Sequence, residues 1–307
     1  MTSDLPNGLV LAALIQSNLA ASAAILVVMA LRTRVRRAFG AEVAYRLWAA
    51  PALAAAASLL PTAPAAEAPA RRLAEAGGAG PLVLAWAAGA ALLALVFGLA
   101  QVRFLHNARR GAAGPAAVGL MAPRVLMPAD DGTYSPQERR LILAHERTHI
   151  ERGDLQASAM IAAAQCLAWF NPLVHLAARL ARLDQELACD AAVLRRHSRQ
   201  RAVYARALLK AQMAGAAAPP LGVGWSRHPL EVRIAELKAR PRDEGAAGPA
   251  AVSCGLVLTF VVAWMLAPPS SPPSPRLMPW ERGDDQPRMS VVLISMPAAA
   301  PKGLASP

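Results

Sequence analysis

The stretch LILAHERTHIERGD, residues 141–154, carries two histidines four positions apart, with a glutamate directly after the first. The preceding SPQE, residues 135–138, offers an N-cap serine, a proline for the first helical turn and a glutamate that completes a capping box. We therefore expect a helix that begins at this box and ends at Gly153. Because residues four apart share a helix face, His145 and His149 can both reach one ion.

This HExxH pattern is typical of zinc hydrolases. Zinc held by two histidines and a carboxylate keeps a fourth position for water, whose pKa then falls toward neutrality. Glu146 follows the first histidine and can take a proton from that water and return it to the leaving amine. The pattern predicts one Zn2+ per chain, with His145 and His149 as ligands and Glu146 as the general base of peptide hydrolysis. The alternative is a helix with a solvated, charged face.

A third ligand is offered by RLDQELACDAAVLRR, residues 182–196. Glu186 and Asp190 stand four apart, so on a helix they share a face. We assign Glu186 to the zinc and Asp190 to the imidazole of one of the two histidines, which a carboxylate can orient. The alternative is a pair of surface acids that bond to Arg182 and other nearby arginines.

Other polar residues are expected in other roles. His175 lies among apolar residues and is expected to be a buried, hydrogen-bonded histidine. Asp154, just past the helix end, is more typical of a cap for the following helix than of a support for the site. Tyr204 is one of several candidates for stabilising the oxyanion, and the sequence does not select one. The remaining histidines lie in basic polar stretches typical of a surface: His106, His197 and His228.

The composition favours helices, since 55% of the 307 residues are hydrophobic but only 5% are aromatic. We expect a mainly α, polytopic membrane protein. No CxxC pair is present, so the cysteines suggest neither a disulfide framework nor a thiolate zinc site.

Four apolar stretches are predicted to cross a membrane: residues 9–31, 46–64, 81–101 and 250–267. About 20 apolar helical residues span a bilayer core. The second stretch is alanine-rich and the shortest of the first three. Between the third and fourth stretches lies the predicted zinc protease domain, residues 102–249.

The sidedness follows from RTRVRR, residues 32–37, directly after the first span. Positive charge in short loops marks the cytoplasmic side. The N-terminus is then outside, the protease domain and its active site are cytosolic, and the Pro-rich tail, residues 268–307, lies outside. We expect a multi-pass protein of the bacterial inner membrane.

The formal net charge of +12 lies largely in the predicted protease domain, which has 21 Lys or Arg against 13 Asp or Glu. A domain resting against anionic lipid explains this charge. We expect no direct binding of nucleic acid, because no nucleic-acid-binding motif accompanies the charge. The oligomeric state is left open.

Residues 155–178 contain no charged residue and are long enough to cross a membrane. If they did, Glu186 would lie on the opposite side from His145 and a single zinc site could not form. Asn171 and Pro172 interrupt the stretch. We therefore predict a helix lying against the membrane or buried in the domain, followed by a turn and a return helix.

Two further segments flank the zinc pattern. VGLMAPRVLMP, residues 118–128, has β-prone residues between prolines, and is either an edge strand that holds the substrate's backbone or an ordinary loop. In HPLEVRIAELKAR, residues 228–240, Leu230, Ile234 and Leu237 share one face of a predicted short helix that can dock onto the domain.

Together GLMAPRVLMP, LILAHERTHIERGDL, WFNPLVHLAARLARLDQELACD and HPLEVRIAEL resemble the membrane zinc metallopeptidases of the beta-lactam sensor-transducer, or antirepressor, family. The resemblance covers about residues 1–267. It implies three spans, a cytosolic gluzincin-like domain and a fourth span. It also implies that His145, His149 and Glu186 bind zinc, that Glu146 is the general base, and that Asp190 is the family's second acid.

The resemblance further implies a signalling role, in which an outside stimulus activates cleavage of a cytosolic transcriptional repressor and sometimes of the protease itself. Well-known members carry an extracellular penicillin-binding sensor domain after the last span, and a Pro-rich tail of 40 residues cannot fold into one. The alternatives are a membrane quality-control zinc protease and a non-catalytic scaffold or receptor with a zinc site.

Overall fold

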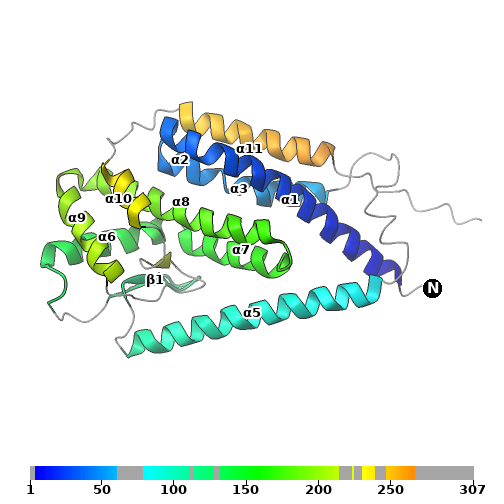
Figure 1. Ribbon diagram of the computed structural model, residues 1–307, viewed down its shortest axis with the longest axis horizontal. Coiled ribbons are helices and arrows are strands. Elements are labelled where there is room, and N and C mark those ends of the chain that lie inside the picture. The colour runs from blue at the N-terminus through cyan, green and yellow to red at the C-terminus, as the bar shows by residue number, and fades with distance from the viewer. Residues whose placement is uncertain are drawn as a thin grey trace, which may run out of the picture. The chain divides into compact units, whose positions relative to one another are not determined.

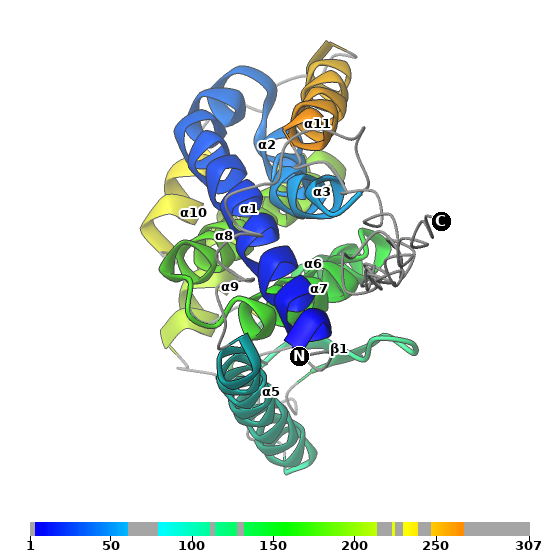
Figure 2. The ribbon, with the colours of Figure 1, turned by 90° about the vertical axis from the view of Figure 1, so that its right-hand side faces the viewer.

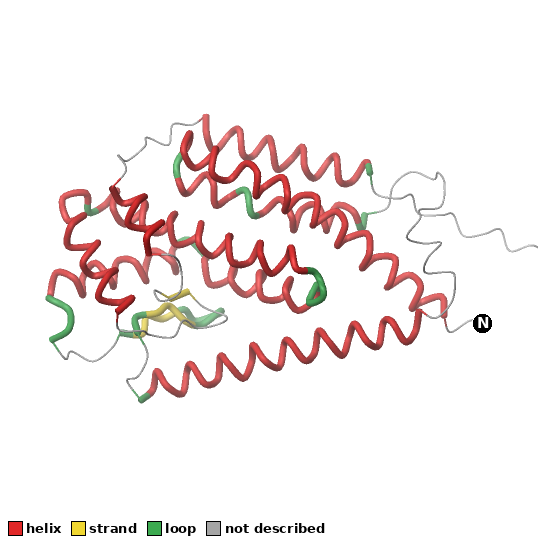
Figure 3. The backbone as a smooth tube through the Cα atoms, viewed as in Figure 1, coloured by secondary structure: helices red, strands yellow, loops and turns green. Residues whose placement is uncertain are grey.

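The computed structural model describes residues 4–60, 79–110, 114–127, 132–213, 223–224, 230–238 and 247–266. These residues are almost entirely helical, with three short strands gathered in one place (Figure 3). The expected mainly α fold class is confirmed. The predicted tail, residues 268–307, lies outside the described residues.

Three helices are long and apolar enough to cross a membrane: α1 (Asp4–Phe39), α5 (Ala79–Arg109) and α11 (Ala247–Met265). They contain nearly all of the first, third and fourth predicted spans. Their apolar side chains are largely exposed, as expected for a surface that faces lipid rather than water.

The second predicted span, residues 46–64, forms no comparable helix among the described residues. Gly40, with φ of +95°, ends α1, and the chain continues as α2 (Ala41–Arg46) and α3 (Ala49–Ser58). At 1.5 Å per residue the ten residues of α3 extend about 15 Å, half of a bilayer core. Helix α3 packs between α1 and α11 (Figure 2).

The helix with the two histidines is α6 (Pro136–Glu151), and it begins as its sequence predicts. The Ser135 hydroxyl accepts a hydrogen bond from the Glu138 amide at 3.2 Å, and the Glu138 carboxylate accepts one from the Ser135 amide at 2.8 Å. Gly153 adopts φ of +72°, a left-handed conformation that ends the helix with little strain in glycine. The predicted capping box and helix stop are confirmed.

The uncharged stretch after α6 forms two helices, α7 (Asp154–Leu167) and α8 (Pro172–Arg196), which lie side by side (Figure 1). Asn171 caps α8, since its side chain accepts a hydrogen bond from the Leu173 amide at 3.0 Å. The predicted turn and return helix are confirmed, and α8 brings the second half of the site back to α6.

The remaining elements enclose α6 and α8. Strand β1 (Ala116–Val118) pairs antiparallel with β2 (Arg124–Leu126) on one side and with β3 (Val223–Gly224) on the other. A 3-10 turn, η1 (Ser198–Gln200), leads from α8 into α9 (Arg201–Met213), and α10 (Leu230–Lys238) packs on α8 and α9. The buried residues of the main core are Tyr134, Leu141, Ile142, Cys189, Val193, Leu194, Tyr204, Ala207, Leu208, Ala211 and Leu237.

Helix α10 docks through the predicted face. Leu237 is buried, and Leu230 and Ile234 are partly buried against the same core. The predicted docking helix at this position is confirmed.

Helix α8 is tied to the end of α1 by a buried carboxylate. Asp184 accepts hydrogen bonds from Arg32 Nη1 at 2.6 Å, Arg36 Nη1 at 3.2 Å and Trp48 Nε1 at 2.8 Å. Its side chain is 1% exposed. Three donors therefore compensate one buried charge, and they fix the position of α8 against α1 and α2.

We expect Asp184→Ala to lower the thermal unfolding midpoint of the detergent-purified chain strongly. The change leaves two arginines without their buried partner, a loss of about 3–5 kcal/mol. Glu151→Ala is the matched control, because Glu151 pairs with Arg196 at the surface, where such pairs contribute about 0–1 kcal/mol. Equal midpoints for the two variants would contradict the role given to Asp184.

Candidate metal centre

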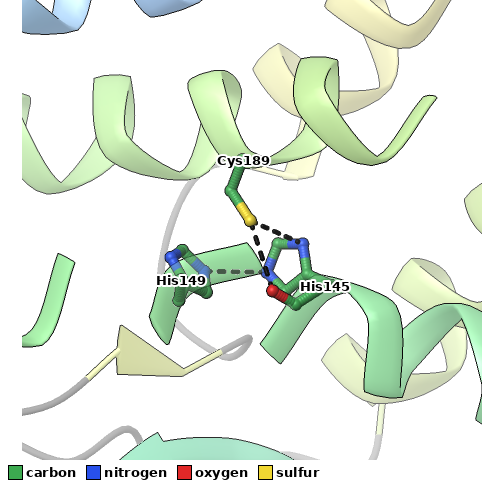
Figure 4. Close-up of side chains that lie close together, drawn as sticks. All are labelled: His145, His149 and Cys189. Atoms are coloured by element: carbon green, nitrogen blue, oxygen red, sulfur yellow. Dashed lines mark hydrogen bonds between the residues drawn. The ribbon is translucent and has the colours of Figure 1, made fainter. Parts of the chain in front are cut away.

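Helix α6 points His145, Glu146 and His149 into the protein interior, where all three side chains are fully buried. The Nε2 atoms of the two imidazoles are 3.0 Å apart (Figure 4). Two imidazole nitrogens this close can share one proton, or both can bind one metal ion. Their convergence therefore makes them candidate ligands of a common ion.

Helix α8 brings Glu186 to the same point. Its Oε2 lies 3.4 Å from His145 Nε2 and its Oε1 lies 3.6 Å from His149 Nε2. Both oxygens are buried, and neither has a hydrogen-bond partner among the described residues. Ligand atoms about 2.1 Å from a tetrahedral zinc are roughly 3.4 Å from one another. The spacing of these nitrogen and oxygen atoms fits such an ion.

Cys189 is a neighbour of the site that the sequence analysis excluded. Its Sγ lies 3.4 Å from His145 Nδ1 and 3.4 Å from the His145 carbonyl oxygen. His145, His149 and Cys189 form a buried group that could hold a metal ion (Figure 4). The absence of a CxxC pair suggested no thiolate zinc site, and the structure nevertheless places one thiol beside the two histidines. The sequence did indicate this position, because Cys189 follows Glu186 by three residues and so shares its helix face.

The far nitrogen of each histidine is held by another side chain. Asp154 Oδ2 lies 2.7 Å from His149 Nδ1. The Tyr204 hydroxyl lies 2.7 Å from His145 Nδ1 and donates to Asp190 Oδ1 at 2.7 Å. Such bonds orient an imidazole and leave Nε2 free to face the other ligands.

These contacts revise two expectations. Asp154 was expected to cap α7, but Gly153 is the cap residue and the Asp154 side chain turns to His149 instead. Tyr204, a candidate for stabilising the oxyanion, lies behind His145. Asp190 lies beside a histidine as predicted, with Oδ1 3.5 Å from His145 Nδ1, although its hydrogen bond is to Tyr204.

Arg233 is a residue of the site that the sequence analysis missed. It reaches from α10 and is 1% exposed. Its Nε and Nη2 donate to Asp190 at 2.8 and 2.6 Å, and its Nη1 lies 3.1 Å from Glu186 Oε2. The alternative of surface acids paired with Arg182 is wrong, because Arg182 donates to Gln165. The sequence did offer one indication of a buried role for Arg233, because it lies between two apolar positions of the docking helix.

Burial and neighbouring charges shift the pKa values of the site. Burial raises the pKa of Glu146. Burial also opposes ionisation of Glu186, but Arg233 and the two histidines outweigh it and lower the pKa of Glu186. Burial alone would lower the pKa of His145, but the Cys189 thiolate and Glu186 raise it to about 9. Glu146 is therefore the carboxylate best suited to accept a proton, and Glu186 stays ionised.

The other histidines that the structure describes are not part of this group. His175 is half-buried, with Nδ1 3.1 Å from the Gln165 amide nitrogen and Nε2 2.9 Å from the Trp169 carbonyl oxygen. The expected role as a hydrogen-bonded histidine is confirmed. His228 lies outside the described residues.

The segment 118–128 contributes to a strand pair beside the site. Strand β2 is at the edge of the sheet and β1 is central. Ala117 of β1 is fully buried against Leu155 and packs with Ile150. The expected strand is confirmed, and the interpretation as an ordinary loop is wrong for residues 124–126.

A capped HExxH helix buried beside apolar helices of membrane-spanning length is characteristic of membrane metallopeptidases. The sequence profile of the BlaR1 peptidase M56 family matches residues 12–77 and 106–237, more than half of the chain. The chain therefore belongs to this metallopeptidase family, and the resemblance seen in the sequence is confirmed.

The chain is also similar to the protein named Regulatory protein BlaR1 of Bacillus licheniformis. The two are 32% identical over 81 residues, which are 26% of this chain and 14% of the relative. The chain thus aligns with a small part of that relative's length.

We expect metal binding at this centre to release protons and to weaken as the pH falls. Below its pKa of about 9, His145 carries a proton that a metal must displace, and the pKa of His149 is also raised. Each displaced proton weakens binding by about tenfold per pH unit. Calorimetric titration with zinc near neutral pH, in buffers of different ionisation enthalpy, measures the protons released. An affinity independent of pH between about 7 and 8 would contradict this arrangement.

Proposed function

We propose that this chain is a membrane-embedded zinc endopeptidase of regulatory signalling that cleaves a cytosolic protein, a transcriptional repressor above all, and also itself. In this proposal His145, His149 and Glu186 bind one Zn2+, and Glu146 is the general base. The observation that carries the proposal is the convergence of two Nε2 atoms and the buried carboxylate of Glu186, 3.0–3.6 Å apart.

Glu186 is preferred over Cys189 as the third ligand because of where the atoms lie. Both Glu186 oxygens face the Nε2 atoms, 3.4 and 3.6 Å away. Cys189 Sγ instead contacts Nδ1 of His145, the nitrogen that the Tyr204 hydroxyl also approaches. An imidazole that binds a metal through Nε2 turns Nδ1 away from it, so Cys189 belongs to the surroundings of the ligand.

A bound zinc ion would act as a Lewis acid, making a water molecule more acidic and polarising the peptide carbonyl. Glu146 accepts the proton of the attacking water and returns it to the leaving amine. Its raised pKa favours the first of these transfers. Asp154 and the Tyr204–Asp190 pair hold the two imidazoles in the orientation that presents Nε2.

The carboxylate of Glu146 favours catalysis over a structural metal site. Both of its oxygens are buried, and no side chain of the described residues donates a hydrogen bond to them, the backbone amide of Ala117 being the neighbouring donor. A buried polar group without a partner is costly. A non-catalytic scaffold would gain nothing from such a buried carboxylate, whereas a general base must keep its oxygens available to water.

The substrate proposal rests on the family and on the sheet edge. Among the described residues strand β2 has one partner strand, β1, so its other edge can pair with an extended peptide. We expect this edge to face the cytosol, because the arginines after the first span predict the cytoplasmic side. A cytosolic repressor is the substrate that the family resemblance implies.

Glu146→Gln is expected to abolish cleavage while zinc binding persists. The amide keeps the size of the side chain but cannot take up a proton, so cleavage should fall by at least about 100-fold. Glu186→Ala should lower zinc content as well as cleavage, because it removes a ligand. The measurements are zinc by elemental analysis and cleavage of candidate repressors by the full-length protein in detergent or vesicles.

Glu151→Gln is the matched control, since Glu151 is an exposed glutamate on the same helix. It should leave both zinc content and cleavage unchanged. Full cleavage by Glu146→Gln would refute the catalytic assignment. Wild-type protein without zinc would favour the partner-binding scaffold.

Cobalt substitution separates the two candidate third ligands. A cysteine thiolate bound to Co2+ gives an intense charge-transfer band in the near ultraviolet, and a carboxylate gives none. We expect the wild-type cobalt form to lack this band, and we expect Cys189→Ala to leave the visible cobalt spectrum intact. A thiolate band that disappears in Cys189→Ala would show that Cys189, not Glu186, completes the ligand set.

A further inference from the structure

Arg233 is a charged residue inside the protein on a short helix that otherwise docks through apolar contacts. Helix α10 has nine residues, and Arg233 is 1% exposed among them. Burying a guanidinium is costly unless carboxylates compensate its charge and accept its hydrogen bonds. The position of Arg233 is therefore set by the acids that it meets on α8.

The guanidinium joins two carboxylates that stand one helical turn apart. Nε and Nη2 donate to the two oxygens of Asp190, a bidentate pair that fixes the plane of the group. This plane leaves Nη1 directed at Glu186, 3.1 Å from Oε2. Oε2 also lies 3.4 Å from His145 Nε2. Arg233 thus restrains both Glu186 and Asp190. Asp190 in turn accepts the hydrogen bond from the Tyr204 hydroxyl behind His145.

We propose that Arg233 is a positioning residue of the metal centre, which fixes the carboxylate of Glu186 against the two histidines through its bidentate anchor on Asp190. This inference rests on the proposed function, because it takes the centre to bind metal. Without Arg233 the Glu186 side chain would be free to rotate. Metal binding would then have to order that side chain, which would weaken the affinity.

The arrangement also makes metal binding depend on the docking of α10. Arg233 reaches the centre only while Leu237 and its neighbours hold α10 on the core. Coupling between two equilibria is reciprocal, so a bound metal must in turn stabilise docked α10. Eight residues, 239–246, separate α10 from α11, a candidate membrane helix. The site is therefore connected along the chain to the membrane through α10.

The test is zinc affinity, measured by competition with a chelator on the full-length protein in detergent. Arg233→Lys keeps the positive charge but cannot bond both carboxylates at once. It should weaken zinc binding by about 10- to 100-fold, the usual effect of losing a residue that orients a ligand. Arg179→Lys, an exposed arginine on α8, is the matched control and should change the affinity by less than about twofold.

Hydrogen exchange supplies a readout that is independent of cleavage. Zinc should slow the exchange of the α10 amides in the wild type and in Arg179→Lys, and should do so far less in Arg233→Lys. If Arg233→Lys does not fold, the test uses a double variant, Asp190→Asn combined with Arg233→Met, in which both opposite charges are removed. That double variant should bind zinc more weakly than the wild type, because it removes both Arg233 and its anchor.

The outcomes separate this inference from the proposed function. Wild-type protein that binds no zinc would overturn the metal centre itself. Wild-type binding with unchanged affinity in Arg233→Lys, or in the double variant, would overturn only the role of Arg233. If zinc still slowed hydrogen exchange in α10 of Arg233→Lys, that result would also overturn the role of Arg233.

Discussion

The burial of charge between α6 and α8 is the constraint on which the rest of this structure depends. Glu146, Asp154, Glu186 and Asp190 are all at most 2% exposed. Carboxylates at such depth remain ionised only where cations or donors compensate them. Arg233 compensates Glu186 and Asp190, and the two histidines face the others. The Glu186 oxygens lie next to both Nε2 atoms, where a divalent cation could take the place of the histidine protons.

That constraint explains the path of the chain. The carboxylates of α8 follow His149 by about 40 residues, so the chain must leave α6 and return to the same side. The α7–α8 hairpin does this, and neither of its helices is among those long and apolar enough to cross a membrane. Gln185 secures its base by donating to the Asp154 carbonyl oxygen at 3.1 Å. The tip is fixed elsewhere, where Asn171 donates to Asn18 and Ser22 of α1 at 3.2 and 2.9 Å.

Local signals made much of this predictable. The capping box at Ser135, the glycine stop and the spacing of His145 and His149 depend on residues within a few positions of one another, and these predictions held. Glu186 was assigned from its spacing to Asp190 on one helix face. The return helix was then predicted, because a single site requires these residues and the histidines on one side of a membrane. The ten-residue α3 was not foreseen, because hydropathy reports apolar length and not where a helix ends.

The surroundings of the ligands could not be predicted, because they depend on which side chains meet across different helices. Asp154 is adjacent to a helix start in sequence, and capping was the local interpretation of it. Its bond to His149 exists only because Gly153 turns the chain back on itself. Likewise Arg233 follows the zinc motif by more than 80 residues, and no periodicity indicates that α10 would place it on α8.

The consequence for function is that α8 is held from several directions at once. Asp184 ties it to the arginines that end α1, and two residues later Glu186 faces the histidines. One turn beyond, Asp190 is held by Arg233 of α10. Because a helix of this length moves nearly as a rigid rod, a displacement of α1 must either break the Asp184 cluster or carry Glu186 with it. The candidate metal centre and the candidate membrane helix α1 are therefore both attached to helix α8.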